Sequence, residues 1–143
     1  MSITTNSPAV DAHGNPTSGP AEATERYDAA IDRLVRFHPD VVDAMSTLTT
    51  DHPSFAMGHA LAAYLHLMST DARDLDTAHT HATALRAAVR NPRETAHSTA
   101  IDAWLAGDWH GAACQLDDLL VDWPADVLAL VIGHQLDFFL GDA

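Results

Sequence analysis

The chain of 143 residues has one cysteine, no lysine and no long hydrophobic run. The single cysteine, Cys114, excludes an internal disulfide and is typical of a reducing compartment, so we expect a cytoplasmic protein. No stretch approaches the 18 consecutive apolar residues of a membrane-spanning helix. Residues 1–10 are polar and lack the basic start and apolar stretch of a signal peptide.

All seven basic residues are arginine, against 20 acidic residues, and the net charge is -13. Binding to nucleic acid requires a basic face that displaces counterions, and binding to anionic membranes requires a similar surface. We therefore expect neither nucleic acid nor membrane as a partner. Because the acidic residues are spread along the chain, they indicate a solvated acidic surface.

Two Gly-Asp pairs, Gly107-Asp108 and Gly141-Asp142, lie 34 residues apart, and each follows an apolar helical run. Thirty-four residues is the period of the tetratricopeptide repeat (TPR), in which each repeat is a pair of antiparallel helices. One such pair cannot bury its apolar face alone, so TPR units stack on one another. The spacing predicts an all-α fold, a degenerate TPR-like solenoid of about seven antiparallel helices.

Proline, glycine and apolar periodicity divide the chain into two parts. Residues 1–20 are rich in proline, glycine and small polar side chains, which predicts a flexible N-terminal segment. Residues 21–143 are predicted to form the TPR-like domain, with three helix pairs and an unpaired last helix. Its helices are expected over about 21–37, between the breaks at 38–39 and 52–53, and over about 54–68, 72–89, 91–106, 108–123 and 125–140.

The start of the fifth helix has the clearest local signal. Asn91 can cap the helix, Pro92 suits its first turn, and Glu94 occupies the third helical position. The same helix should end at Gly107, the expected C-terminal glycine. We interpret Arg93 and Glu94 as a cap and surface pair rather than a catalytic couple.

The chain also contains a series of short blocks in a fixed order. They are Asp11, Gly14 and Pro16; Tyr27-Asp28-Ala29-Ala30; Phe55-Ala56-Met57-Gly58-His59-Ala60; Arg93-Glu94 with His97; Gly107-Asp108; Leu120 with Pro124; Leu128-Ala129-Leu130 with His134; and Phe139-Leu140-Gly141. This series resembles the N-terminal part of the tetratricopeptide repeat protein 38 family. The resemblance covers nearly the whole chain and implies a helical TPR-like fold, without a reaction that transfers to this protein.

Ten histidines are the main chemical signal in the sequence. His59, His97 and His134 are separated by about one repeat each and fall on the first helices of successive pairs, which line the concave groove in TPR stacks. Three converging imidazoles can bind zinc, and one can act as an acid or base near neutral pH. The alternative, which we favour, is that these histidines pack between helices or line the groove without a metal.

Two aromatic residues at equivalent repeat positions, Trp104 and Phe138, are further groove candidates that could form the floor of an apolar pocket. The leading hypothesis is a scaffold that binds a peptide or protein segment in its concave groove, without a cofactor. The alternative is a histidine-lined small-molecule or metal-dependent enzyme site that is complete only in longer relatives. The apolar last helix also predicts self-association through the C-terminal end.

Overall fold

The computed structural model describes residues 9–69 and 71–141, which form seven α-helices and no strand beyond one isolated bridge between Val10 and Pro16. The all-α prediction is therefore confirmed. No helix in these ranges is both long and apolar enough to cross a membrane. The helices are α1 (Ala21–Val35), α2 (Val41–Asp51), α3 (Ala56–Met68), α4 (Ala72–Ala88), α5 (Pro92–Leu105), α6 (Trp109–Asp122) and α7 (Val127–Leu140).

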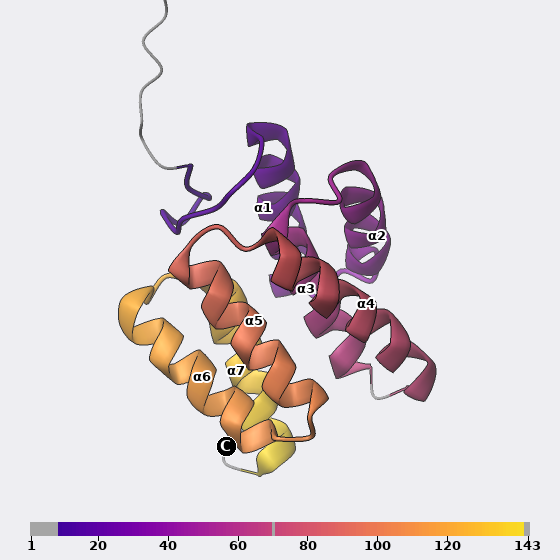
Figure 1. Cartoon of the computed structure of the whole chain (residues 1–143), viewed down its shortest axis with the longest axis vertical. Helices are drawn as coiled ribbons and strands as arrows, with labels where there is room; N and C mark the ends of the chain where they lie inside the picture. The colour runs from indigo at the N-terminus through magenta and orange to yellow at the C-terminus, as the bar shows by residue number, and fades with distance from the viewer. Residues whose placement is uncertain (1–8, 70, 142–143) are drawn as a thin grey trace, which may run out of the picture.

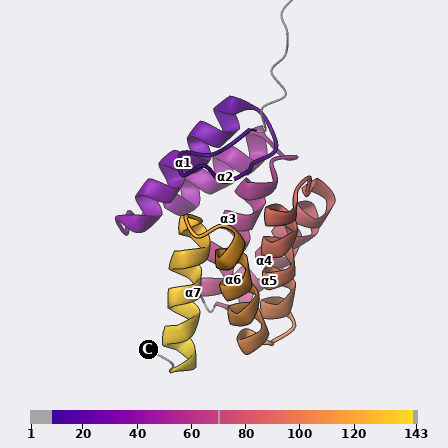
Figure 2. The same cartoon turned by 90° about the vertical axis from the view of Figure 1, so that its left-hand side faces the viewer.

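Helices that follow one another in the chain lie side by side. α1 contacts α2, α3 packs along α4, α5 packs along α6, and α7 lies against α6 (Figure 1). The first helices of these pairs also meet, because α3 contacts both α1 and α5, and α1 reaches α7. Figure 2 shows α7 at the front of the molecule, below α1 and beside α6.

The centre of the fold is α3, whose residues 56–64 are all buried. This helix contacts α1, α2, α4 and α5 and is covered on nearly every side. A helix that is apolar all round is typical of such a central position. Gly58 permits a close approach here, since a Cβ atom at this position would lie 3.1 Å from the Phe55 ring.

The predicted helix ends of the second half of the chain are confirmed. The Asn91 side chain accepts a hydrogen bond from the backbone N–H of Glu94, and the Asp108 side chain accepts one from Gly111. Gly107 and Gly141 have φ angles of 83° and 77°, the left-handed conformation that glycine adopts at the ends of helices. Local chemistry alone predicts these boundaries.

The end of α1 differs from the prediction. The helix was expected to continue to about residue 37, but it ends at Val35, and Phe37 adopts a left-handed φ of 57°. The backbone N–H of Phe37 donates to Leu34, and that of His38 donates to Arg33. A left-handed conformation costs a residue other than glycine roughly 1–2 kcal/mol. The fold therefore holds Phe37 in a strained and exposed position.

The N-terminal segment departs from the predicted flexibility. Within residues 9–20, the side chains of Asp11, Asn15 and Thr17 are buried. The Asn15 amide donates to the backbone carbonyl of Ala125, 110 residues away, and the backbone N–H of Ser18 donates to a Glu94 carboxylate oxygen. Residues 9–20 are thus docked against the helices, whereas residues 1–8 lie outside the described part.

Candidate functional site

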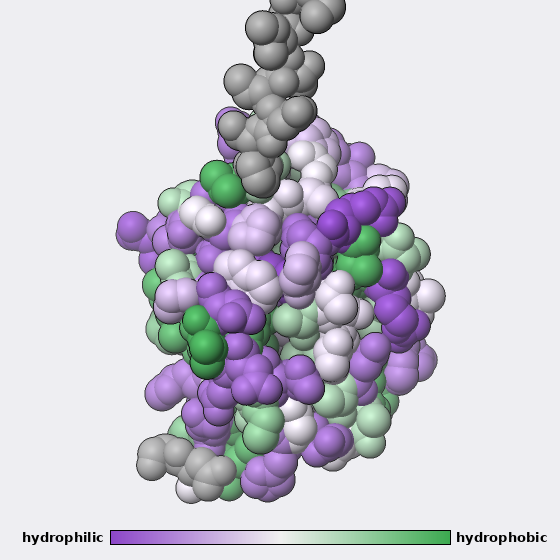
Figure 3. All heavy atoms as spheres, turned by 60° about the vertical axis from the view of Figure 1, so that its left-hand side comes forward, coloured by the Kyte–Doolittle hydropathy of each residue, from purple (hydrophilic) through white to green (hydrophobic). Residues whose placement is uncertain are grey.

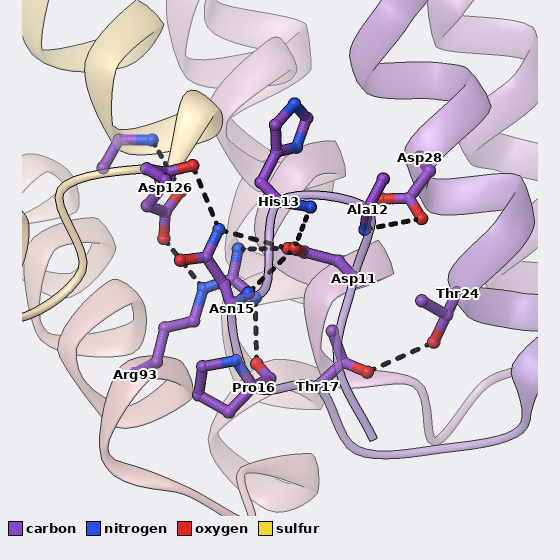
Figure 4. A network of polar contacts seen from close by, with 12 residues as sticks. Asp11, Ala12, His13, Asn15, Pro16, Thr17, Thr24, Asp28, Arg93 and Asp126 are labelled. Atoms are coloured by element: carbon purple, nitrogen blue, oxygen red, sulfur yellow. Dashed lines mark hydrogen bonds and ion pairs between the residues drawn. The ribbon is translucent and has the colours of Figure 1, made fainter. Parts of the chain in front are cut away.

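A buried polar network centred on Arg93 joins the N-terminal segment, α5 and the start of α7 (Figure 4). The Arg93 guanidinium is 1% exposed, with Nε 2.8 Å from Asp126 Oδ2 and Nη2 3.2 Å from Asp11 Oδ2. Its Nη1 donates to the backbone carbonyl of Pro16 at 2.9 Å. Each part of the guanidinium therefore has an oxygen partner, as a buried charge requires.

His97 extends this network into the core. Its Nε2 lies 2.8 Å from Asp126 Oδ2, and its Nδ1 lies 2.8 Å from the Tyr64 hydroxyl on α3. Because an ionised carboxylate can only accept hydrogen bonds, His97 Nε2 carries a hydrogen and is the donor in its bond to Asp126. Burial raises the pKa of the Tyr64 hydroxyl well above its usual value, so the phenol stays protonated and can donate to Nδ1.

Asp126 occupies the junction of the network. Its Oδ1 accepts a hydrogen bond from the backbone N–H of Ala129 and thereby caps α7. Burial alone would raise the pKa of this carboxyl group, but the interactions with His97 and Arg93 outweigh burial and hold the pKa well below its usual range. Asp126 therefore stays ionised and ties α5 to the start of α7.

Arg93 and Glu94 are not the surface pair that the sequence suggested. Both side chains are buried, and the Glu94 carboxylate accepts hydrogen bonds from the backbone N–H of Arg90 and from the backbone N–H and hydroxyl of Ser18. Asp11 and Asp126, which the sequence does not single out as ion-pair partners, both pair with Arg93. Because the network is closed to solvent, its role in this structure is to hold the segments together.

His59 lies in a separate cluster on α3 and α4. Its Nδ1 is 3.0 Å from His81 Nδ1, its Nε2 is 2.6 Å from the backbone carbonyl of Pro53, and the His66 ring stacks on His81. Burial, followed by the charges of His59 and His66, lowers the pKa of His81 to about 4. Both ring nitrogens of His59 are thus engaged in contacts within the protein.

His134, the third predicted groove histidine, is exposed on α7 and lies beside an apolar hollow. The three histidines therefore have different surroundings: a buried network for His97, an imidazole cluster for His59, and a surface hollow for His134. Among the described residues, they do not bring their ring nitrogens together around one ion position. The geometry gives the proposed three-histidine metal site no common centre.

The two aromatic candidates also have different environments. Trp104 is buried against Tyr64 and Trp109, whereas Phe138 is 68% exposed. Phe139, next to Phe138, contacts the Trp109 ring with the centroids 5.8 Å apart. Equivalent spacing in the sequence therefore gives one core residue and one surface residue.

The best candidate for a binding site is the hollow beside His134, with a volume of about 470 Å3. It lies where the end of α1, the end of α3 and the middle of α7 come together. Six of its eight lining residues are apolar, and three of them, Val35, Phe37 and Leu130, are strongly exposed. The lining residues are Leu34, Val35, Phe37, Met68, Leu130, Val131, His134 and Gln135.

The face shown in Figure 3 is dominated by hydrophilic side chains, with hydrophobic ones in small separate groups.

No protein-family model matches the chain, and a search of the solved structures finds none that matches it.

Proposed function

We propose that the protein is a TPR-like helical scaffold that binds an apolar polypeptide segment in the hollow between α1, α3 and α7. The hollow itself is the observation that carries the proposal. Its lining residues come from α1, α3 and α7, three of the helices expected to come first in their repeats, and from the turn after α1. In a TPR-like stack these first helices line the concave, ligand-binding side.

The chemistry of the hollow supports an apolar ligand group. A volume of about 470 Å3 is within the range of small ligand pockets and can hold a few apolar side chains. Phe37 is 85% exposed even though its backbone conformation is strained. Strain of this kind is often found at ligand sites, where the surrounding structure holds a residue ready for contact.

The polar lining residues and the net charge suggest what surrounds the apolar group. Gln135 and His134 can offer both hydrogen-bond donors and acceptors to a peptide backbone. The net charge of -13 favours a ligand whose flanking residues are basic and disfavours an acidic one. A segment with two or three large apolar side chains between arginine or lysine residues fits both features.

The proposal can be tested with three labelled peptides in a fluorescence-anisotropy titration. The first carries leucine and phenylalanine between arginines, the second has the arginines replaced by glutamates, and the third has the apolar residues replaced by serine. We expect measurable binding of the first alone, weakened at least tenfold by Leu130→Asp. Val121→Asp, an equally drastic change at an exposed apolar residue on α6, should have no effect. Equal binding of all three peptides, or equal sensitivity to both substitutions, would contradict the proposal.

A further inference from the structure

Asp11, His13 and Asp28 form a cluster that neither the buried network nor the apolar hollow explains. One potential ligand atom of each residue lies within 4.8 Å of the other two, and no other trio of His, Cys, Asp or Glu in residues 9–69 and 71–141 meets this condition. Asp11 and His13 belong to the N-terminal segment, and Asp28 belongs to α1 (Figure 4). The cluster therefore joins two separate segments of the chain.

The local backbone places these three residues in position. Asp11 Oδ1 accepts hydrogen bonds from the backbone N–H groups of His13 and Asn15, at 2.9 and 3.0 Å, which folds the segment into a tight turn. Gly14 permits this turn with a φ of 80°. Asp28 Oδ2 accepts from the backbone N–H of Ala12 at 3.1 Å, which docks the turn on α1.

The second carboxylate oxygen of Asp28, Oδ1, is the feature that most favours a bound cation here. Asp28 Oδ1 is buried and has no hydrogen-bond partner. Among the described residues, no other buried side-chain oxygen or nitrogen atom lacks a partner. A carboxylate oxygen in this state loses its hydration without compensation. The Asp11 and Asp28 carboxylates also each place an oxygen within 4.8 Å of the other. A cation would compensate both the orphaned oxygen and the repulsion between the carboxylates.

We propose that Asp11, His13 and Asp28 bind a divalent transition-metal ion, with zinc as the preferred ion. One imidazole nitrogen and two carboxylate oxygens are common zinc ligands. Calcium is disfavoured because it takes six to eight oxygen ligands, and manganese should bind the same set more weakly than zinc.

The distances allow this ion with a small adjustment. Ligand atoms around a tetrahedral zinc are about 3.3 Å apart, given bonds of about 2.0–2.1 Å. The three potential ligand atoms lie within 4.8 Å of one another, and the exposed His13 side chain has room to turn its ring toward the carboxylates. An adjoining hollow of about 390 Å3, lined by Asp11, Thr24, Glu25 and Asp28 among others, leaves room for water as a fourth ligand.

Asp11 would serve both this site and the buried network. Its Oδ2 lies 3.2 Å from Arg93 Nη2 and 3.4 Å from the Asn15 amide nitrogen, and its Oδ1 accepts the two backbone bonds of the turn. The amide contact is the longest of these, so it is the one that an ion would displace. The bound ion would then fasten residues 9–20 to α1, in addition to the link through Arg93.

Isothermal titration of the full-length chain, purified without a histidine tag, with zinc chloride tests the proposal. We expect one ion per chain, with an affinity that falls at least tenfold in both His13→Ala and Asp28→Asn. His38→Ala is the matched control, because His38 is also exposed and has an acidic neighbour, Asp40, 3.4 Å away. This control should leave zinc binding unchanged.

Cobalt supplies a second, spectroscopic measurement, because its visible absorption changes with the number and arrangement of its ligands. The cobalt spectrum should be lost in His13→Ala, a change of an exposed residue that leaves the buried core untouched. Absence of stoichiometric zinc binding would overturn the proposal. So would binding that survives both His13→Ala and Asp28→Asn, or that falls equally in His38→Ala.

Discussion

At the scale of single residues, Arg93 shows how burial changes the meaning of a charged side chain. Near the surface its pairs with Asp11 and Asp126 would contribute at most about 1 kcal/mol. Here the Arg93 side chain is 1% exposed, so any charge of the network left without its partner would lose its hydration without compensation. The network is consequently a strong constraint on which segments lie together.

Replacing Arg93 with methionine should lower the free energy of unfolding by about 3–5 kcal/mol, because Asp11 and Asp126 would stay buried without their cation. Arg86→Met, the control, breaks an exposed ion pair with Asp102 and should lower the free energy of unfolding by no more than about 1 kcal/mol. Urea denaturation of both variants measures the difference. Equal losses would show that burial of the Arg93 network adds no stability.

His81 should make the fold sensitive to mild acid. Its folded pKa of about 4 lies below the unfolded value of 6.5, so the unfolded chain takes up the proton first as the pH falls. The free energy of unfolding should therefore decrease as the pH falls from 6.5 to 4. Below pH 4 the contribution of His81 should no longer change. Since the ring is partly exposed, we expect a decrease of about 1–2 kcal/mol.

Denaturation at pH 7 and at pH 4.5 measures this effect, and His81→Gln should reduce the difference between the two conditions. His79→Gln provides the control, because His79 is exposed on the same helix. Protonation of Asp126 should destabilise the fold only at lower pH, below about 4, because the pKa of this carboxyl group is depressed. An unchanged difference in His81→Gln would show that other groups cause the acid sensitivity.

At the scale of secondary-structure elements, the N-terminal segment is the clearest departure from expectation. Its composition predicts flexibility, but Asp11, Asn15, Thr17 and Ser18 all have partners outside a simple local turn. Gly19 lies against the Phe55 ring, where a Cβ atom would approach to 2.9 Å. Composition records how little apolar surface a segment has, but it cannot show which buried groups need the segment's polar atoms.

The flexibility that composition predicts for residues 1–20 implies that a chain truncated to begin at Gly19 would lose no more than about 1 kcal/mol of stability. The docked contacts now predict a loss of about 2–4 kcal/mol, or roughly 10 °C in melting temperature, because Arg93 and Glu94 would lose oxygen and hydroxyl partners. Calorimetry of the truncated chain measures this. A full-length chain with residues 9–18 in shuffled order should lose as much, whereas a small loss in both would show that the segment is dispensable.

At the scale of the whole molecule, α7 is covered from two sides, by α6 and by contacts with α1. The sequence predicts an unpaired last helix here. Leu128, Ile132 and Leu136 are buried as a result, while Leu130 and Phe138 remain exposed. The exposed apolar side chains of α7 thus fall into two places, with Leu130 in the hollow beside α1 and Phe138 and Phe139 at the C-terminal end of the helix.

Exposed phenylalanine at the C-terminal end still predicts self-association. Burying one such side chain contributes about 1.5–3 kcal/mol, and Phe138 and Phe139 lie together with their ring centroids 6.2 Å apart. Sedimentation at micromolar concentration should show dimers or larger species that Phe138→Asp plus Phe139→Asp converts to monomers. Val121→Asp, at an exposed residue on α6, should not dissociate them. A wild-type chain that sediments as a monomer would contradict this prediction.

The sequence by itself determined the all-α class, the approximate positions of the helices and several of their ends. These features depend on residues close together in the chain: apolar side chains three or four positions apart, prolines between helices, Asn91 and Asp108 as caps, and glycine at positions 107 and 141. Such interactions form within one helix and its turn, so their signal is readable before the fold is known.

Only the tertiary structure decided the partners of Arg93, the separation of His59, His97 and His134, and the meeting of Asp28 with Asp11 and His13. These arrangements join residues far apart in the chain, such as Asn15 and Ala125. Helical periodicity reports which face of a helix is apolar, but it does not report which other helix covers that face or how far one helix is turned against the next. The positions of the polar side chains follow from that packing, because a buried charge must lie where its partner lies.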